Sequence, residues 1–280
     1  MGRSTLVATL TQGLSLTAAS FIVTVYGDVV VPRGGMLWMG SLIGICRRIG
    51  ISESLVRTAV SRLVAAGRLQ GERAGRRSFY RLAPAAQAEF AEAARLLYAS
   101  RPSLRGWLVL AATDLPDETK RRFHITRMGG EVWLAPDWGE VPSGTDLVLR
   151  TEGNDLARHP GLARFWDLSS LQSRYDAMIA RFSPLADTLR ERGGLTGADA
   201  LTARLVLVHV YRGAVLRDPF LPEGAMPQDW SGAAARALFR QIYLELSPAA
   251  DSEIAQTLKD ITGDLPARTA ESMSRIKGLM

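Results

Sequence analysis

Arginine side chains are concentrated in one stretch of the chain, residues 47–81, where hydroxyl side chains accompany them. Nine arginines lie between Arg47 and Arg81, accompanied by only two acidic residues, Glu53 and Glu72, so this segment carries a local charge of +7. Guanidinium groups bind phosphates and guanine in a bidentate manner, and hydroxyl groups bind base edges or phosphates. The segment is therefore suited to bind double-stranded DNA.

A helix is predicted to begin immediately after Ser52. Val56, Ala59, Val60 and Leu63 are spaced by three and four residues, which is the pattern of one apolar helix face. Ser52 is a favourable N-cap and Gly67 a favourable stop, so the helix has a signal at each end. Such a helix fits a major groove. We expect it to contact DNA through Ser52, Arg57, Thr58, Ser61 and Arg62.

A basic hairpin is predicted after Gly67. Leu69 and residues 78–82 have the character of two short strands, and residues 73–77 (RAGRR) form a glycine-containing loop between them. We expect Arg76 and Arg77 to reach phosphates from this loop. Helix and hairpin together predict a winged helix. The alternative is a solvated basic surface on an ordinary helix and hairpin.

The residues before this helix are predicted to support it. Residues 37–49 indicate a preceding helix that ends at Gly50, which would complete a helix-turn-helix. Residues 1–17 are polar enough to form a loose arm. Residues 18–26 fit either a helix or a strand, and a first helix is favoured ahead of a winged helix. Residues 29–31 (VVV) are expected to form a short buried strand.

The net charge of +6 is distributed unevenly along the 280 residues. Residues 1–100 contain 12 arginines and 5 acidic residues, whereas the remaining 180 residues contain 22 basic and 23 acidic groups. A polyanionic partner is therefore indicated for the N-terminal part alone. A hydrophobic content of 47% allows a substantial core and two or three domains.

Residue types that perform chemistry elsewhere are sparse in this chain. Cys46 is the only cysteine, which excludes an intramolecular disulfide and a cysteine-based zinc cluster and fits a reducing cytosol. His124, His159 and His209 show no metal or triad spacing, and no phosphate-binding or dinucleotide fingerprint is present. Residues 4–27 lack charge, but their threonines argue against a membrane span. We expect a cytoplasmic protein that has no cofactor and is not an enzyme.

The rest of the chain predicts an α+β protein in three segments. Residues 84–99 read as a connecting helix, and residues 101–103 (RPS) as a boundary. Strands are expected at 107–112, 131–135 and 146–151, with a helix at 117–128. Helices follow at 162–185 with an interruption near Pro184, and then at 198–216, 232–246 and 251–277. The predicted domains are residues 1–100, 101–160 and 161–280.

Several of these segments together resemble the PaaX family of phenylacetate-catabolism repressors. In the N-terminal part the resemblance is carried by residues 21–24 (FIVT), 27–28 (GD), 56–63 (VRTAVSRL) and 75–82 (GRRSFYRL). In the C-terminal part it is carried by Trp166, Tyr175 and residues 207–212 (LVHVYR), 218–222 (DPFLP) and 229–232 (DWSG).

The resemblance implies an N-terminal winged helix-turn-helix, a central ferredoxin-like domain related to Cas2 and a helical C-terminal domain. It also implies a homodimeric repressor of an inverted-repeat operator, released by an aryl-CoA thioester such as phenylacetyl-CoA. Arginine would hold the CoA phosphates and aromatic rings would enclose the acyl group. The candidate effector-binding residues are Arg204, His209, Tyr211, Arg212 and Trp230, although turn and core roles explain these residue types better than ligand binding does.

A different class of function uses the central segment. Asp114 follows the strand predicted at 107–112, where a Cas2-type nuclease would hold a metal carboxylate. A second acidic group from a symmetry-related copy would be needed for such a site. The alternative function is therefore a metal-dependent nucleic-acid enzyme, with the basic N-terminal segment as its tether.

Overall fold

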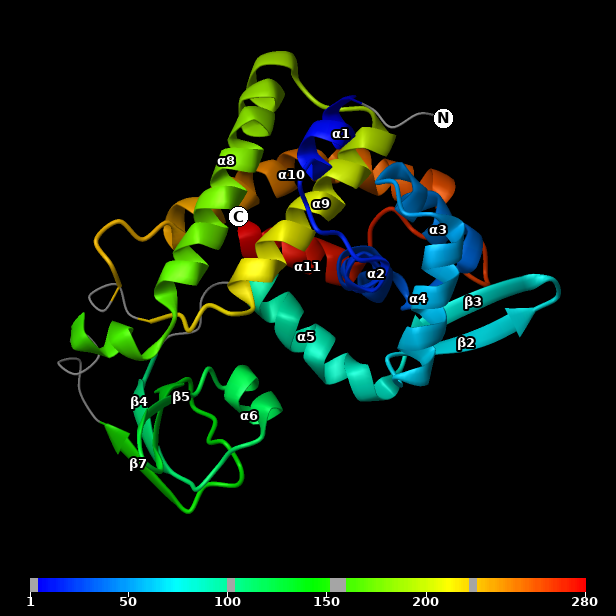
Figure 1. Cartoon of the computed structure of the whole chain (residues 1–280). Helices are drawn as coiled ribbons and strands as arrows, with labels where there is room; N and C mark the ends of the chain where they lie inside the picture. The colour runs from blue at the N-terminus through cyan, green and yellow to red at the C-terminus, as the bar shows by residue number, and fades with distance from the viewer. Residues whose placement is uncertain (1–4, 100–103, 152–159, 222–225) are drawn as a thin grey trace. The chain divides into compact units, whose positions relative to one another are not determined.

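The computed structural model describes residues 5–99, 104–151, 160–221 and 226–280 of the chain (Figure 1). Helices are combined with one three-stranded and one four-stranded sheet, both antiparallel. The expected α+β class is thereby confirmed. The chain divides into two compact units, which we call the larger unit (1–100, 178–212 and 235–280) and the smaller unit (101–177 and 213–234).

The N-terminal segment of the larger unit is more ordered than its polarity indicated. Helix α1 (Thr5–Thr11) buries Val7 and Leu10, so the expected loose arm is wrong for these residues. Helix α2 (Ala18–Val25) is capped by Thr17 and confirms the first predicted helix. The strand expected at residues 29–31 is wrong, because the chain continues as a π-helix, η1 (Tyr26–Val30), and a 3-10 turn, η2 (Val31–Arg33).

A short sheet and two helices follow within the same unit. Strand β1 (Met36–Trp38) precedes α3 (Met39–Arg48), and α4 (Glu53–Ala65) leads into the hairpin of β2 (Leu69–Ala74) and β3 (Arg77–Leu82). The strands are ordered β1-β3-β2. The helix predicted from residue 37 begins two residues later, since Leu37 and Trp38 pair with Tyr80 and Phe79 of β3.

Long helices make up most of the C-terminal sequence. The connecting helix is α5 (Pro84–Tyr98), and it is followed much later by α8 (Leu168–Arg192), α9 (Gly197–Val215), α10 (Gly232–Thr257) and α11 (Ala270–Leu279). The break expected near Pro184 is absent, because this proline lies inside α8. Pro248 likewise lies inside α10, which covers the helix predicted at 232–246 and continues to Thr257. The single helix predicted at 251–277 is wrong, because its first residues belong to α10 and its last residues to the separate helix α11.

The core of the larger unit surrounds α2. Phe21, Ile22 and Val25 are completely buried, and α2 packs against both α3 and α4. Burying large apolar side chains is the main contribution to folding, at about 1.5–3 kcal/mol for each such side chain. The two helices that follow β1 are therefore anchored on a rigid apolar support.

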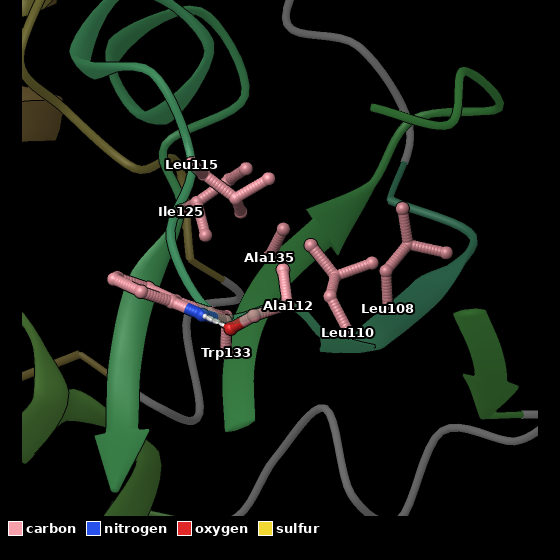
Figure 2. Packing of buried hydrophobic residues seen from close by; sticks show 7 residues of the cluster. All are labelled: Leu108, Leu110, Ala112, Leu115, Ile125, Trp133 and Ala135. Carbon is pink, nitrogen blue, oxygen red and sulfur yellow. Dashed lines mark hydrogen bonds between the residues drawn. The ribbon is translucent and has the colours of Figure 1, made fainter. Parts of the chain in front are cut away.

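The smaller unit contains a four-stranded antiparallel sheet in the order β5-β6-β4-β7. Its elements are β4 (Gly106–Ala111), α6 (Asp117–Arg122), β5 (Thr126–Gly129), β6 (Val132–Asp137), β7 (Leu147–Thr151) and the 3-10 helix η3 (Pro160–Phe165). Helix α6 is shorter than the predicted 117–128, because the chain enters β5 at Thr126. Figure 2 shows one buried cluster, in which the Trp133 indole nitrogen donates to the carbonyl oxygen of Ala112 over 2.9 Å.

The two units do not coincide with the three segments predicted from the sequence. The larger unit combines the N-terminal hundred residues with most of the C-terminal helices. The predicted boundary at 101–103 lies outside the described residues, and the three-domain division stays a prediction. None of the described helices combines the length and the apolar character needed to cross a bilayer.

Candidate nucleic-acid interface

Helix α4 is built as the sequence predicted. The Ser52 hydroxyl accepts the backbone N–H of Leu55 over 3.4 Å, which satisfies one of the free donors at the helix start. Gly67 adopts a φ of +65° just past the helix end, a conformation that glycine tolerates best. Val56, Ala59 and Val60 are buried on the face that packs against α2 and α3.

The opposite face of α4 is open to solvent. Its predicted DNA-contacting side chains are all exposed, namely Ser52, Arg57, Thr58, Ser61 and Arg62. Leu55 lies among them with 57% of its surface exposed, and the sequence-based set omitted it. Leu55 precedes Ala59 by four residues and lies at the edge of the apolar stripe, so the spacing alone did not mark it as exposed. An exposed apolar side chain here matches the apolar contact that thymine methyl groups accept.

The hairpin presents its arginines at the tip. Six residue pairs align β2 with β3, from Leu69 opposite Leu82 to Ala74 opposite Arg77, so the connecting turn consists of Gly75 and Arg76. Gly75 has a φ of +57°, as tight two-residue hairpin turns require. The strands extend away from α4 as a two-stranded ribbon (Figure 1), with Arg76 and Arg77 exposed.

The charge of this surface is only partly neutralised. Arg57 pairs with Glu53 at 2.8 Å, and Arg81 pairs with Glu72 at 2.9 Å. These exposed pairs are weak and exchange readily with other anions. Of the nine arginines between Arg47 and Arg81, four form no ion pair with any described residue, namely Arg62, Arg73, Arg76 and Arg77. Three of these four belong to the hairpin, which therefore carries unneutralised positive charge.

Residues of α10 and of the segment after it form ion pairs and hydrogen bonds with the elements that support α4, within the larger unit. Arg48 at the end of α3 pairs with Glu253 of α10 at 2.6 Å. Arg33 donates to Asp251 at 2.8 Å and to the carbonyl oxygens of Pro266 and Ala267. Charge-assisted hydrogen bonds of this kind fix geometry more strongly than neutral ones. The orientation of α3 and α4 therefore depends on α10 and the segment after it.

A buried charge network lies deeper in the larger unit. Asp28 accepts hydrogen bonds from the hydroxyls of Tyr98 and Tyr243 at 2.9 and 2.8 Å, and from Arg204 Nε at 3.1 Å. Burial alone would raise the pKa of Asp28, but the charge of Arg204 and the two hydroxyl donors lower it on balance. Arg204 also donates to Asp251 at 2.9 Å. Its guanidinium is thus an internal counter-ion that exposes only 1% of its surface.

The other candidate effector residues also have internal partners. His209 Nδ1 lies 3.0 Å from the Thr24 hydroxyl, and Arg212 donates to the same hydroxyl at 3.0 Å. Tyr211 is buried and stacks on Phe239 with 4.2 Å between ring centroids. Trp230 belongs to the smaller unit, where it packs edge-on against Tyr175.

The structure therefore does not assemble these five residues in one compact unit. Holding CoA phosphates with Arg204 would require the network around Asp28 and Asp251 to open, because both carboxylates already contact its guanidinium. Removing one partner from such a buried pair leaves an uncompensated charge, which is strongly unfavourable.

Asp114, the candidate metal carboxylate, lies on the surface of the smaller unit. It accepts a hydrogen bond from Lys120 at 2.8 Å, which lowers its pKa, and another from the backbone N–H of Leu115 at 2.8 Å. The part of the chain that the structure describes contains no group of three or more side chains able to hold a metal ion. These contacts give Asp114 a local role at the start of the turn into α6.

Comparison with known proteins identifies the family of this chain. Residues 17–86 match the family model described as PaaX-like protein, and residues 166–256 match that of the PaaX-like protein C-terminal domain. The transcriptional repressor PaaX of Escherichia coli (strain K12) is 32% identical, over 96% of this chain and 92% of that protein. This chain belongs to the PaaX family. The resemblance found in the sequence is confirmed.

A solved structure supports the fold alone. The uncharacterized protein Rv0674 from Mycobacterium tuberculosis superimposes with a TM-score of 0.51 at 22% sequence identity. The match covers 85% of this chain and 99% of that protein. The arrangement of helices and sheets in this chain is thus similar to that of a protein whose sequence is only 22% identical.

Proposed function

We propose that this PaaX-family protein is a transcriptional repressor that binds operator DNA through a winged helix-turn-helix formed by α3, α4 and the β2–β3 hairpin. The observation that carries the proposal is the hairpin tip, where the exposed Arg76 and Arg77 have no ion-pair partner among the described residues. The name of the Escherichia coli relative, transcriptional repressor PaaX, supports the same function. The proposed function consists of DNA binding and repression, neither of which includes a catalytic step. We therefore propose that the protein is not an enzyme.

In the proposed complex α4 lies in the major groove and the hairpin lies on the adjacent backbone. Thr58 and Ser61 are exposed and face away from the buried stripe. Hydroxyl groups in such a position can bind base edges or phosphates. Arg57 lies one helix turn before Ser61, and Arg62 lies one helix turn after Thr58. Two copies of the chain would read the half-sites of an inverted repeat, because a two-fold symmetric dimer matches a palindromic operator.

The smaller unit is proposed to be a ferredoxin-like domain. Its strand order, with β4 and β6 central and β5 and β7 at the edges, is the order of a split βαβ arrangement. All strand pairs are antiparallel, and α6 connects β4 to β5. This proposal assigns residues 101–160 a supporting role, whereas DNA is bound by residues 1–100.

Release from DNA is proposed to follow binding of an aryl-CoA thioester such as phenylacetyl-CoA. This part rests on the family resemblance, since the five candidate effector residues lie in two units. An effector releases DNA only if it binds more tightly to a conformation that does not fit the operator. His209 and Arg212 contact Thr24 of α2, so a ligand that displaced them would act directly on the helix behind α4.

Salt-dependent binding tests the DNA interface. The double variant Arg76→Ala, Arg77→Ala is compared with the wild type on a duplex containing the chain's own promoter, and dissociation constants are measured over a series of salt concentrations. Each lost phosphate contact reduces the slope of log K against log salt by about 0.9, so we expect a decrease of about 2. Arg190→Ala is the control, because Arg190 is an exposed α8 arginine paired with Asp187. An unchanged slope in the double variant would remove the hairpin from the interface.

Release is tested separately. Phenylacetyl-CoA is added to the preformed complex with the promoter duplex, and free CoA serves as the control. The proposal expects dissociation with the thioester and none with CoA. A complex that resists a panel of aryl-CoA esters would overturn the release mechanism and leave DNA binding standing.

A further inference from the structure

We propose that Trp38 is a positioning residue for DNA binding, because its indole ring fixes the guanidinium of Arg77 for a phosphate contact. This inference rests on the proposed function, and it adds a residue outside α4 and the hairpin to the interface. The guanidinium carbon of Arg77 lies 5.0 Å from the centroid of the Trp38 ring. At this separation a cation is attracted to the electron-rich face of the ring, and tryptophan is the strongest such partner.

The register of the small sheet brings the two residues together. Trp38 ends β1 and lies opposite Phe79 of β3, so Arg77 is its diagonal neighbour two residues along the same strand. Diagonal neighbours in antiparallel strands are within reach of long and aromatic side chains. Arg77 is also the first residue after the Gly75–Arg76 turn. The ring contact therefore acts at the base of the arginine-rich tip.

The ring itself is held in place. The Trp38 backbone N–H donates to the carbonyl oxygen of Lys259 over 2.8 Å, and the Lys259 N–H donates to the Ser41 hydroxyl over 3.1 Å. Gly40 lies directly under the ring, since a Cβ atom at this position would clash with it. A half-buried ring with these supports gives a fixed surface for Arg77.

Stacking and phosphate binding are compatible in one guanidinium group. A guanidinium group that stacks on a ring presents its flat face to the ring, whereas its N–H donors lie in the plane of the group and stay available to phosphate oxygens. Stacking also restricts a long side chain before DNA arrives, which lowers the entropy lost on binding. Arg76 has no ring contact or ion pair with the described residues, so it serves as the unsupported reference.

A double-mutant cycle tests the assignment with the full-length protein and its promoter duplex. We expect Trp38→Leu to weaken binding by about 2- to 5-fold. In the Arg77→Ala background the same substitution should have no further effect, whereas in the Arg76→Ala background its full effect should remain. Trp38→Phe, which keeps a weaker ring face, should restore part of the loss. Equal losses from Trp38→Leu in all three backgrounds would overturn the positioning role.

A second pair of variants moves the ring without removing it. Gly40→Ala should weaken binding by displacing the ring, while Gly44→Ala, on the same helix with nothing within 4 Å of its added Cβ, should not. This pair decides the question if Trp38→Leu fails to fold in a thermal unfolding control. Equal affinities for Gly40→Ala and Gly44→Ala would overturn the inference. A wild-type protein that binds no duplex would instead overturn the proposed function itself.

Discussion

The Nε atom of Arg204 lies 3.1 Å from Oδ2 of Asp28, and neither side chain exposes more than 2% of its surface. These residues are 176 positions apart, in the segment after α2 and in α9. Tyr98 of α5 and Tyr243 of α10 donate to the same carboxylate. The buried carboxylate of Asp28 therefore connects the segment after α2, the helix on which α4 packs, to the three later helices α5, α9 and α10.

Replacing Asp28 by alanine should destabilise the protein severely. The substitution leaves Arg204 buried beside one remaining carboxylate, Asp251, and removes the acceptor for two buried tyrosine hydroxyls. Breaking a buried pair in this way costs about 3–5 kcal/mol. The free energy of unfolding, measured by urea denaturation, should decrease by that amount.

The matched control for Asp28→Ala is Asp187→Ala. Asp187 pairs with Arg190 on the exposed surface of α8, at 2.9 Å. Exposed pairs contribute at most about 1 kcal/mol, so this variant should be almost as stable as the wild type. Similar losses of stability in the two variants would contradict a structural role of the buried network.

Local signals explain why α4 and the β2–β3 hairpin could be predicted from the sequence. The Ser52 cap, the apolar spacing of α4 and the stop at Gly67 all lie within 16 residues of one another, and each acts through neighbouring backbone. The hairpin is equally local, because its register is set by the Gly75–Arg76 turn. Exposure of the seven predicted DNA-contacting residues follows from these two elements.

Contacts between distant residues explain what the sequence could not predict. The sequence gives no sign that Arg204 pairs with Asp28, because the two residues are 176 positions apart. The formation of helix α1 in place of the expected loose arm likewise depends on a distant residue. Arg181 of α8 donates to the carbonyl oxygens of Leu10 and Gln12. The strand prediction for residues 29–31 was wrong for another reason. A run of three valines has no hydrophobic periodicity, so it does not distinguish a strand from a helix.

Leu55 should recognise a thymine methyl group. It is 57% exposed in the first turns of α4, beside the polar residues that we assign to the groove. A buried methyl group contributes about 0.8 kcal/mol, which corresponds to about fourfold in affinity. Replacing thymines of the promoter duplex by uracil, one at a time, should reveal a position where the wild type loses this factor and Leu55→Ala does not.

The control for the uracil scan is Leu149→Ala. Leu149 has a comparable exposure of 54% but lies on β7 of the smaller unit. It should lose the same factor as the wild type at the sensitive position. A uracil scan with no sensitive position, or with equal sensitivity in Leu55→Ala, would contradict the contact.

Asp114→Ala should leave DNA binding unchanged. The carboxylate is engaged by Lys120 and by the Leu115 backbone, so its removal alters only the turn before α6. Affinity for the promoter duplex should therefore match that of the wild type within twofold. The same experiment includes Mg²⁺ and scores cleavage of the duplex, since cleavage by the wild type that is lost in the variant would support the nuclease alternative.

Stability should decrease as the pH falls below about 6.5, in part because of His209. Burial, assisted by the nearby charge of Arg212, lowers the pKa of His209 in the folded protein to about 4, from an ordinary value of 6.5. Between these two values the unfolded chain binds a proton that the folded protein does not. The stability that the neutral His209 contributes is thus fully present above pH 6.5, and it is lost progressively as the pH falls to about 4. The free energy of unfolding changes by at most about 1.4 kcal/mol per pH unit in this range. His209→Gln should flatten the pH dependence of unfolding in this window, whereas an unchanged slope would show that other groups determine it.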